Sequence, residues 1–461
     1  MSTDVVRVRT GVYHDSVSLM RVSRTAAALP GVQVAVVAMA TELNLGIAAE
    51  LGFDLPKAGP ADLLIALRGG EADALEAALA ELDGLLAGLS TPPAGGGAEH
   101  PPHTVRAAAR EHAATLALVS VPGPYAFAEA LDAVEAGLSV MIFSDNVPVE
   151  QEVLLKRRAA ELGVLVMGPD CGTAVIGGAG LGFANVLRPG PVGLVAASGT
   201  GAQQVACLLD HAGVGVSHVL GVGGRDLSAD VGGLSTLRAL EALDADPATE
   251  LIVLISKPPA PEVARAVAET VAKLDTPVVT ALLGPGQDDL TTATETVLRA
   301  LGAPVPAWPS WPAPGTAREH AGGLRGIYSG GTLCVEARLI TGSGEFTDFG
   351  DDAYTVGRAH PMIDPTLRLE ALAEVPPGEV VLIDVVLGHG ADPDPAATLA
   401  PVVAGATARG VTVIVALVGS EGDPQGLNAQ AEALNAAGAA VFTSNAQAAG
   451  HAAEVAAGNA R

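Results

Sequence analysis

Residues 192–201 read Val-Gly-Leu-Val-Ala-Ala-Ser-Gly-Thr-Gly, and residues 324–332 read Leu-Arg-Gly-Ile-Tyr-Ser-Gly-Gly-Thr. Each stretch is a short apolar strand, then Ser-Gly and a Thr, then a run typical of a helix. Small residues permit a tight turn and leave backbone amides pointing outward at a helix N-terminus, which is a ready anion site. Two copies predict that two helix ends face one anionic group. The predicted anion-binding residues are Ser198, Gly199, Thr200 and Gly201 in one turn and Ser329, Gly330, Gly331 and Thr332 in the other.

The Ser and Thr residues of these turns have a plainer interpretation as helix caps. A cap of this kind stabilises a helix by about 1 kcal/mol, and Ser and Thr are favoured there for that reason alone. Taken singly, each residue would be a cap. We favour ligand binding because the two turns form a matched pair.

The composition limits the fold and the partners. The chain has 461 residues, 49% hydrophobic and 3% aromatic, which predicts three or four domains with Ala, Val and Leu cores under helix-covered parallel sheets. Its formal net charge of −26 argues against nucleic-acid and anionic-membrane partners. An anionic substrate must therefore be held locally by backbone amides and a few cations. The N-terminus has no signal-peptide pattern, so we expect a soluble cytoplasmic protein.

The order of strand and helix signals predicts an α/β chain of four domains. These are a small N-terminal α/β domain (1–94), a Rossmann-like domain (100–190), and two flavodoxin-like domains (191–302 and 320–461). Composition predicts linkers at 91–97 and 304–314. The last two domains both open with the Ser-Gly turn and resemble degenerate repeats. The Ala-rich helices suggest a homo-oligomer or separate partner subunits.

Polar residues follow several predicted strands, where ligands bind in parallel sheets. Asn146, Asp170 and Thr173 are substrate-binding candidates in the second domain, and they can equally form Asx-type turns. Lys257 follows a buried strand of the third domain. It could neutralise an anion, and a solvated lysine is as good an interpretation.

Two histidines and one arginine are further candidates in the fourth domain. His389 lies between glycines after a predicted strand, with Asp392 and Asp394 near enough in sequence to orient its imidazole. His360 lies in a stretch with Arg358, which could clamp a carboxylate. A loop histidine held by a carbonyl and an Arg–Asp pair are the structural alternatives.

The sequence gives little support for a metal site, a disulfide or a catalytic cysteine. The three cysteines (Cys171, Cys207 and Cys334) form no CxxC pair, so disulfides and zinc sites are not expected, and Cys171 has no adjacent base that would make it a nucleophile. No ligand spacing predicts a resident metal, although Asp351 and Asp352 could meet Mg²⁺ with a phosphate substrate.

Several short motifs carry a resemblance to a known family. The second and third domains resemble the α subunit of succinyl-CoA synthetase, and the fourth resembles the C-terminal ligase domain of its β subunit. Nearly the whole chain resembles the FdrA family of the acyl-CoA synthetase superfamily. The motifs are Val-Pro-Gly-Pro at 121–124, Gly-Pro-Asp-Cys at 168–171, Gly-Val-Gly-Gly at 221–224, and the stretches 11–17 and 354–365.

The resemblance implies that the two turns hold phosphate, as the paired helix ends do in those ligases. The ligases also carry a phosphorylated histidine after the last strand of the third domain, but residues 284–289 here read Gly-Pro-Gly-Gln-Asp-Asp. No G-x-G-x-x-G loop precedes the second domain, so the sequence gives no support for CoA binding there. An ATP-grasp domain and a Walker A loop are also missing, so ATP chemistry would need a partner subunit.

Three functions remain open. FdrA-like proteins are connected with carbamoyl transfer in purine and allantoin breakdown, which implies carbamoyl phosphate or phosphate as substrate. The second possibility is an ADP-forming acyl-CoA synthetase with His389 as the phosphate carrier. The third is a non-catalytic subunit, against which the retention of both turns weighs mildly.

Overall fold

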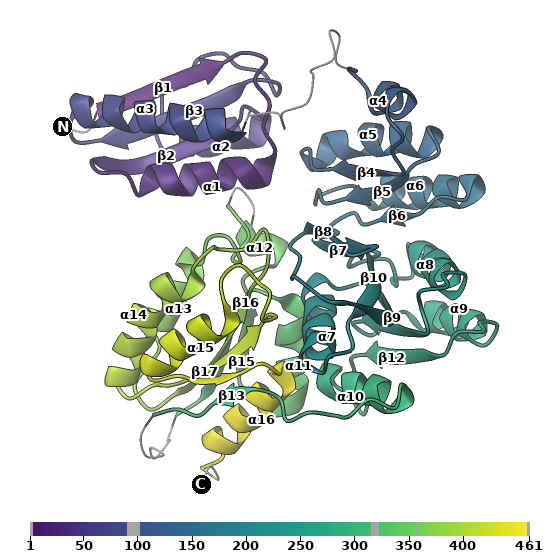
Figure 1. The fold of residues 1–461 in the computed structure, drawn as a ribbon. Coiled ribbons are helices and arrows are strands. Elements are labelled where there is room, and N and C mark those ends of the chain that lie inside the picture. Colours follow the sequence, from purple (N-terminus) through teal and green to yellow (C-terminus); the bar gives the residue numbers. More distant parts are fainter. Residues whose placement is uncertain (1–2, 90–101, 315–321, 356–357, 459–461) are drawn as a thin grey trace. The chain divides into compact units, whose positions relative to one another are not determined.

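The computed structural model describes residues 3–89, 102–314, 322–355 and 358–458, which form two compact units (Figure 1). One unit consists of residues 1–103 with 354–364, and the other of residues 104–353 with 365–461. The predicted α/β fold is confirmed throughout both units. The predicted linker 91–97, and the predicted domain ends at 94, 100 and 320, lie outside the described residues.

The smaller unit contains an antiparallel sheet in the order β1-β3-β2. Asp15 caps α1, because its carboxylate accepts a hydrogen bond of 2.9 Å from the amide of Ser18. Leu75 and Leu79 of α3 and Leu19 of α1 share one core with the sheet, while Ala48 of α2 belongs to a second core. The elements are β1 (Thr3–Arg9), α1 (Ser16–Ala27), β2 (Val32–Met39), α2 (Glu42–Glu50), β3 (Leu63–Gly69) and α3 (Ala72–Leu89).

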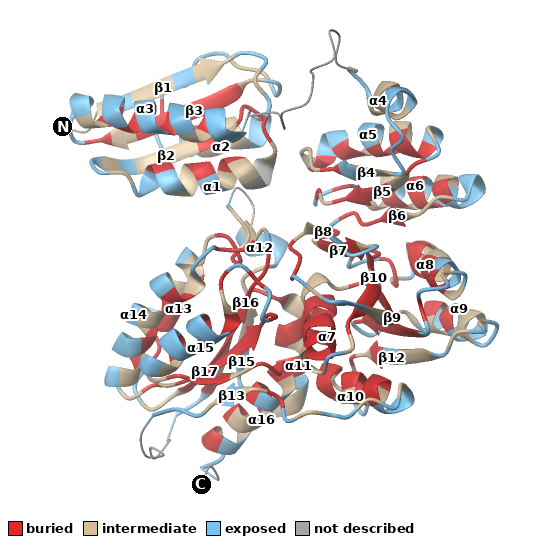
Figure 2. Ribbon diagram, in the orientation of Figure 1, coloured by how far each residue is buried: buried red, intermediate tan, exposed pale blue. Residues whose placement is uncertain are grey.

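The larger unit begins with a small parallel sheet in the order β4-β5-β6. Its strands are short and apolar, and Val140, Met141 and Ile142 of β5 are fully buried (Figure 2). The elements are α4 (Val105–Glu111), β4 (Leu116–Val119), α5 (Gly123–Glu135), β5 (Ser139–Ile142), α6 (Val149–Leu162) and β6 (Val166–Met167).

A six-stranded sheet follows in the order β12-β11-β9-β10-β7-β8. The hairpin of β7 and β8 pairs antiparallel with β10. Residues 173–182 thus belong to the third sheet, whereas the sequence analysis assigns 100–190 to the second domain. The elements are β7 (Thr173–Ile176), β8 (Ala179–Gly182), β9 (Pro189–Ala196), α7 (Gly199–His211), β10 (Val216–Gly221), α8 (Leu234–Asp244), β11 (Leu251–Ser256), α9 (Pro261–Val271), β12 (Val278–Leu282) and α10 (Leu290–Ala300).

The last sheet has the order β13-β18-β17-β16-β14-β15. The proline-rich stretch predicted as a linker supplies its edge strand β13, which pairs with β18, and Trp308 is buried. The elements are β13 (Ser310–Trp311), β14 (Leu324–Tyr328), α11 (Gly331–Thr341), β15 (Glu345–Asp348), α12 (Asp352–Thr355, which crosses from one unit into the other), α13 (Thr366–Ala373), β16 (Val380–Val386), α14 (Pro395–Ala408), β17 (Thr412–Val418), α15 (Leu427–Ala436), β18 (Ala440–Phe442) and α16 (Asn445–Ala456).

Both six-stranded sheets share one topology around the Ser-Gly turn. The strand before the turn, β9 or β14, is flanked by the next strand on one side and by the strand after that on the other. The chain therefore reverses its direction of progress across the sheet at this strand, and ligands bind at such switch points in open α/β sheets. Each Ser-Gly turn lies at the switch point of its own sheet.

Candidate anion site at two helix N-termini

The two Ser-Gly turns lie against each other. A β-carbon at position 330 would lie 2.7 Å from Thr200 Oγ1, and one at position 201 would lie 3.1 Å from Thr332 Cγ2. Helices α7 and α11, which begin at these turns, run side by side in Figure 1. Glycine is needed at 330 because any larger residue would collide with Thr200. The structure thus brings together the two helix ends that the sequence singles out.

A buried polar network holds the two helices at this spacing. The carboxylate of Glu336 in α11 accepts hydrogen bonds of 2.6 Å from the amide of Leu290, at the start of α10, and from Asn445 Nδ2. Gln204 of α7 donates to the carbonyl of Thr443 and accepts from the amide of Asn445, both at 3.0 Å. Burial raises the pKa of Glu336 to about 7. These bonds tie the third domain to the fourth next to the site.

The first turn is capped by its own serine. Ser198 Oγ accepts a hydrogen bond of 2.9 Å from the amide of Gly201, so the cap interpretation holds for this residue. Thr173 lies close by, 3.3 Å from where a β-carbon of Gly199 would be. Its hydroxyl donates to the carbonyl of Phe183 at 2.8 Å. Thr173 therefore packs against the first turn, and its hydroxyl is already used in the hydrogen bond to Phe183.

The second turn already holds a carboxylate. Asp384 is fully buried in β16, and its side chain accepts from the amides of Ser329 and Gly330, both at 2.8 Å, and from the hydroxyl of Ser329. Arg368 pairs with this carboxylate at 2.8 Å. The backbone amides of two predicted anion-binding residues, Ser329 and Gly330, thus donate to Asp384 and are not available to a ligand. The amides of Gly331 and Thr332, at the first positions of α11, are those left to face an anion at this turn.

Lys257 and Asp348 meet at the start of α11. A β-carbon at position 331 would lie 2.3 Å from Asp348 Oδ2 and 3.4 Å from Lys257 Nζ. Lys257 follows β11 of the third sheet and Asp348 ends β15 of the fourth. Burial raises the pKa of Asp348 to about 6, with Asp384 and Asp351 adding to the rise and the amide of Gly350 and Lys257 opposing it. The predicted cation is therefore at the paired helix ends.

Asn146 and Asp170 mark strand ends of the second domain. Both have left-handed backbone, with φ of 53° and 56°. Loss of hydration of its carboxylate is the largest cause that raises the pKa of Asp170. The negative charges of Asp145 and Asp352 raise it further, and the positive charge of Lys257 lowers it. The side chain of Asp170 is exposed to solvent.

His389 is exposed, on a loop after β16 whose neighbouring residues Gly388 and Ala391 are buried. Its backbone pairs with Ala184, whose carbonyl accepts from the His389 amide at 2.8 Å. Gly388 has φ of 114°, and a β-carbon there would lie 2.7 Å from the Ala184 carbonyl oxygen, so glycine is required. The predicted orienting carboxylates have other partners: Asp392 accepts from the amide of Asp394, which in turn caps α14.

His360 and Arg358 belong to the smaller unit. The amide of Met362 donates to His360 Nδ1 at 3.2 Å, and the amide of Arg358 donates to the carbonyl of Thr355 at 3.0 Å. The Arg358 side chain is exposed. The anion site described above is therefore built from the larger unit alone.

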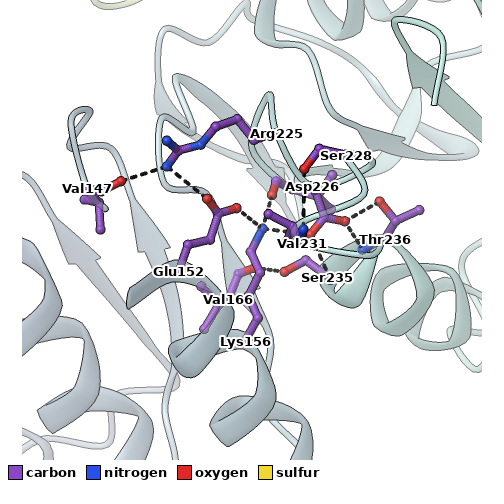
Figure 3. A network of polar contacts seen from close by, with 11 residues as sticks. Val147, Glu152, Lys156, Val166, Arg225, Asp226, Ser228, Val231, Ser235 and Thr236 are labelled. Carbon is purple, nitrogen blue, oxygen red and sulfur yellow. Dashed lines mark hydrogen bonds and ion pairs between the residues drawn. The ribbon is translucent and has the colours of Figure 1, made fainter. Parts of the chain in front are cut away.

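A buried ion cluster fixes the second domain to the third (Figure 3). Lys156 of α6 lies 2.7 Å from carboxylate oxygens of both Glu152 and Asp226, and it donates to the carbonyl of Val222 at 3.0 Å. Asp226 also accepts from the amide and hydroxyl of Thr236 at the start of α8. The cluster holds the glycine-rich loop after β10 in place.

The cysteines and acidic residues give no second centre in the described part of the chain. Burial raises the pKa of Cys171 and Cys334 to about 12, which is consistent with inert thiols. Among the described residues, no group of three or more His, Cys, Asp or Glu side chains could hold a metal ion. Within the same residues, no helix has the length and apolar character needed to cross a membrane.

Sequence reasoning missed the two acidic residues at α11. Asp384 interrupts the run Val-Val-Leu-Ile-Asp-Val-Val in a fully buried strand, and a lone charge in such a strand was the available signal. Asp348 gave no such signal, because its place next to Lys257 depends on how the two domains pack.

Two protein families match separate parts of the chain. Residues 327–455 match the family described as CoA-ligase. Residues 1–102 match the family described as "AllF, heavy metal-associated domain". The residues of this domain do not fit a heavy-metal site, since the three cysteines lie at 171, 207 and 334 and the described residues contain no metal-binding group.

Individual relatives extend the match to the whole chain. The uncharacterized protein YahF of Escherichia coli (strain K12) is 37% identical over 96% of this chain and 97% of its own length. Succinate–CoA ligase [ADP-forming] subunit alpha 2 of Archaeoglobus fulgidus is 32% identical, over 33% of this chain and 54% of that subunit. A solved dinucleotide-forming acetyl-coenzyme A synthetase 1 of Ca. Korarchaeum cryptofilum covers 77% of this chain and 84% of its own at 15% identity, with a TM-score of 0.32. On the sequence matches, the chain belongs to the same family as E. coli YahF, and its residues 327–455 belong to a CoA-ligase domain.

Proposed function

We propose that this protein binds an acyl phosphate at the paired starts of α7 and α11 and transfers its acyl group, with carbamoyl phosphate as donor and the amide of oxamate as acceptor. The observation that carries the proposal is the contact between the two turns, where Thr200 meets Gly330. A helix N-terminus attracts an anion with roughly 0.3–1 kcal/mol, and two ends with Lys257 act on the same charge.

In the proposed reaction the amide nitrogen of oxamate attacks the carbamoyl carbon. The carbon–oxygen bond to phosphate breaks, and phosphate leaves with the electron pair to give oxalurate. The helix ends and Lys257 would stabilise the charge that grows on the leaving oxygen. The nitrogen loses a proton in this step, and the departing phosphate takes it up and leaves as hydrogen phosphate.

Residues 327–455 match a CoA-ligase family, which favours group-transfer chemistry of the ligase kind, and residues 1–102 match an AllF-type domain, which is consistent with a place in allantoin breakdown. The motifs that resemble FdrA, and the loop 284–289 without a histidine, favour an acyl phosphate held directly over a phosphohistidine.

The test is phosphate release from carbamoyl phosphate in the presence and absence of oxamate. A matched pair of variants at position 199 isolates the charge effect: Gly199→Asp adds a carboxylate at the start of α7, and Gly199→Asn adds the same shape without charge. We expect oxamate-dependent release in the wild type, partial loss in the Asn variant and full loss in the Asp variant. Equal activity in both variants would overturn the proposed site.

A second candidate is an ADP-forming acyl-CoA synthetase that works with a nucleotide-binding partner. Its support is the exposed side chain of His389, on the loop after β16 at the switch point next to the second turn, together with relatives that are named as CoA-ligase subunits. Labelled phosphate from ATP would then appear on the chain when the partner is supplied, and His389→Asn would abolish it. Carbamoyl transfer unaffected by His389→Asn favours the first function. A chain that does neither is a non-catalytic subunit.

A further inference from the structure

The N-terminal domain holds a segment that is distant from it in sequence. Residues 354–364 group with residues 1–103 in one compact unit, while residues 353 and 365 belong to the larger unit. The chain thus leaves the larger unit after Ala353, joins the N-terminal domain for eleven residues by this numbering, and returns at Pro365. This segment carries Arg358 and His360.

The end of this segment is folded into a tight turn. The carbonyl of His360 accepts from the amides of Ile363 at 2.7 Å and Asp364 at 3.0 Å, and its Nδ1 accepts from the amide of Met362. Pro361, Met362 and Ile363 at the tip are all buried, the last two at 6% and 3% exposure. A turn of this length has no interior of its own, so other parts of the chain cover these apolar side chains, and the turn groups with the N-terminal domain.

A charged side chain of the N-terminal domain binds the backbone of the same turn. Arg24, in the last turn of α1, donates a hydrogen bond to the carbonyl of Ile363. Hydrogen bonds from an ionised donor are among the stronger ones in proteins. The contact therefore combines apolar burial with a directed polar bond, which are the two elements of a specific peptide-binding surface.

We propose that the N-terminal domain is an intrachain docking module whose ligand is the turn 360–363, in place of a metal ion. The domain lacks cysteine altogether, and its described residues contain no metal-binding group. Docking to this turn keeps the domain attached to the chain without help from the covalent connection through residues 91–97. This inference is independent of the proposed carbamoyl transfer.

The test is to cleave the chain between the N-terminal domain and the remainder, and to measure whether the two fragments stay associated. A protease site is introduced at residues 95–97 of the full-length protein, the purified chain is cleaved, and the fragments are followed by analytical ultracentrifugation. We expect the N-terminal fragment to stay bound to the remainder at micromolar concentration, with and without EDTA. Separation of the wild-type fragments at that concentration would overturn the proposal, and so would separation caused by EDTA alone.

Point variants identify the surface that is responsible. Arg24→Ala should weaken the association of the cleaved fragments at least tenfold, because an ionised donor is lost. Arg21→Ala, an exposed arginine one turn earlier in α1, is the matched control and should leave it unchanged. Ile363→Asp places a charge in the buried turn and should separate the fragments. Equal association for Arg24→Ala and Arg21→Ala, together with continued association of Ile363→Asp, would refute docking at this turn. Far-UV circular dichroism of the uncut variants checks that each is folded.

Discussion

Replacing Asp348 by asparagine should tighten anion binding and remove most of its pH dependence. The Asp348 carboxylate lies with Lys257 at the start of α11, so an ionised Asp348 both repels an incoming anion and competes for the lysine. Its pKa of about 6 means that it is mostly ionised at pH 7.5 and mostly protonated at pH 5.5. Anion affinity of the wild type should therefore fall as the pH rises through 6.

The size of the effect follows from that pKa. Suppose that the anion binds only when Asp348 is protonated. The wild-type affinity is then lower than that of the fully protonated protein by the factor 1 + 10^(pH − pKa). This factor is roughly 30 at pH 7.5 and about 1.3 at pH 5.5. Asparagine is always neutral, so Asp348→Asn should bind up to roughly 30-fold more tightly than the wild type at pH 7.5 and about equally at pH 5.5. These are upper limits, because the ionised form keeps part of the affinity.

Isothermal titration with sulfate is the appropriate assay, since sulfate stays a dianion over this range and phosphate does not. Asp275→Asn is the matched control, because it removes the same charge from the loop before β12, at the edge of the sheet away from the Ser-Gly turn. Equal sulfate affinity for the wild type and Asp348→Asn at pH 7.5 would refute the placement of Asp348 at the anion site. Absence of sulfate and phosphate binding to the wild type at every pH would instead remove the proposed function.

Three further substitutions test other parts of the site. Gly330→Ala places a β-carbon 2.7 Å from Thr200 Oγ1. It should therefore abolish sulfate binding in titration and lower the free energy of unfolding by about 1–3 kcal/mol in urea denaturation. A second change, Thr200→Gly, removes the clash and should restore part of the binding and part of the stability. Lys257→Met should lower sulfate affinity several-fold at pH 5.5, whereas Lys273→Met, at an exposed position just after the C-terminal end of α9, should leave it unchanged. Lys156→Met leaves Asp226 buried without its cation and Glu152 with Arg225 as its remaining partner, so it should cost about 3–5 kcal/mol of unfolding free energy, and a loss under 1 kcal/mol would mean that water replaces the lysine.

The sequence predicts the features of this fold that are local. The α/β order and the strand-to-helix turns at Ser198 and Ser329 each depend on a few consecutive residues, and the structure has both. The pairing of β7 with β10 depends on residues that are far apart, so the hairpin at 173–182 could not be assigned to its sheet in advance.

The candidate site could be predicted only in outline for the same reason. The two turns were visible as a repeated motif, and their mutual contact was an expectation from the repeat. That Asp384 takes the donors of Ser329 and Gly330 depends on the register of β14 against β16. That Lys257 meets Asp348 depends on the packing of one domain against another, for which no short sequence pattern exists.

The presence of both Ser-Gly turns in one polypeptide has a consequence for assembly. A site divided between separate chains forms only at concentrations above their dissociation constant, and it is lost on dilution. Two halves joined covalently meet at an effective concentration in the millimolar range that is set by the connecting chain. Residues 304–314 provide that connection here, and β13 within it is anchored to the last sheet. The pairing of α7 with α11 is therefore first order in protein, always one to one, and insensitive to the amount of protein in the cell.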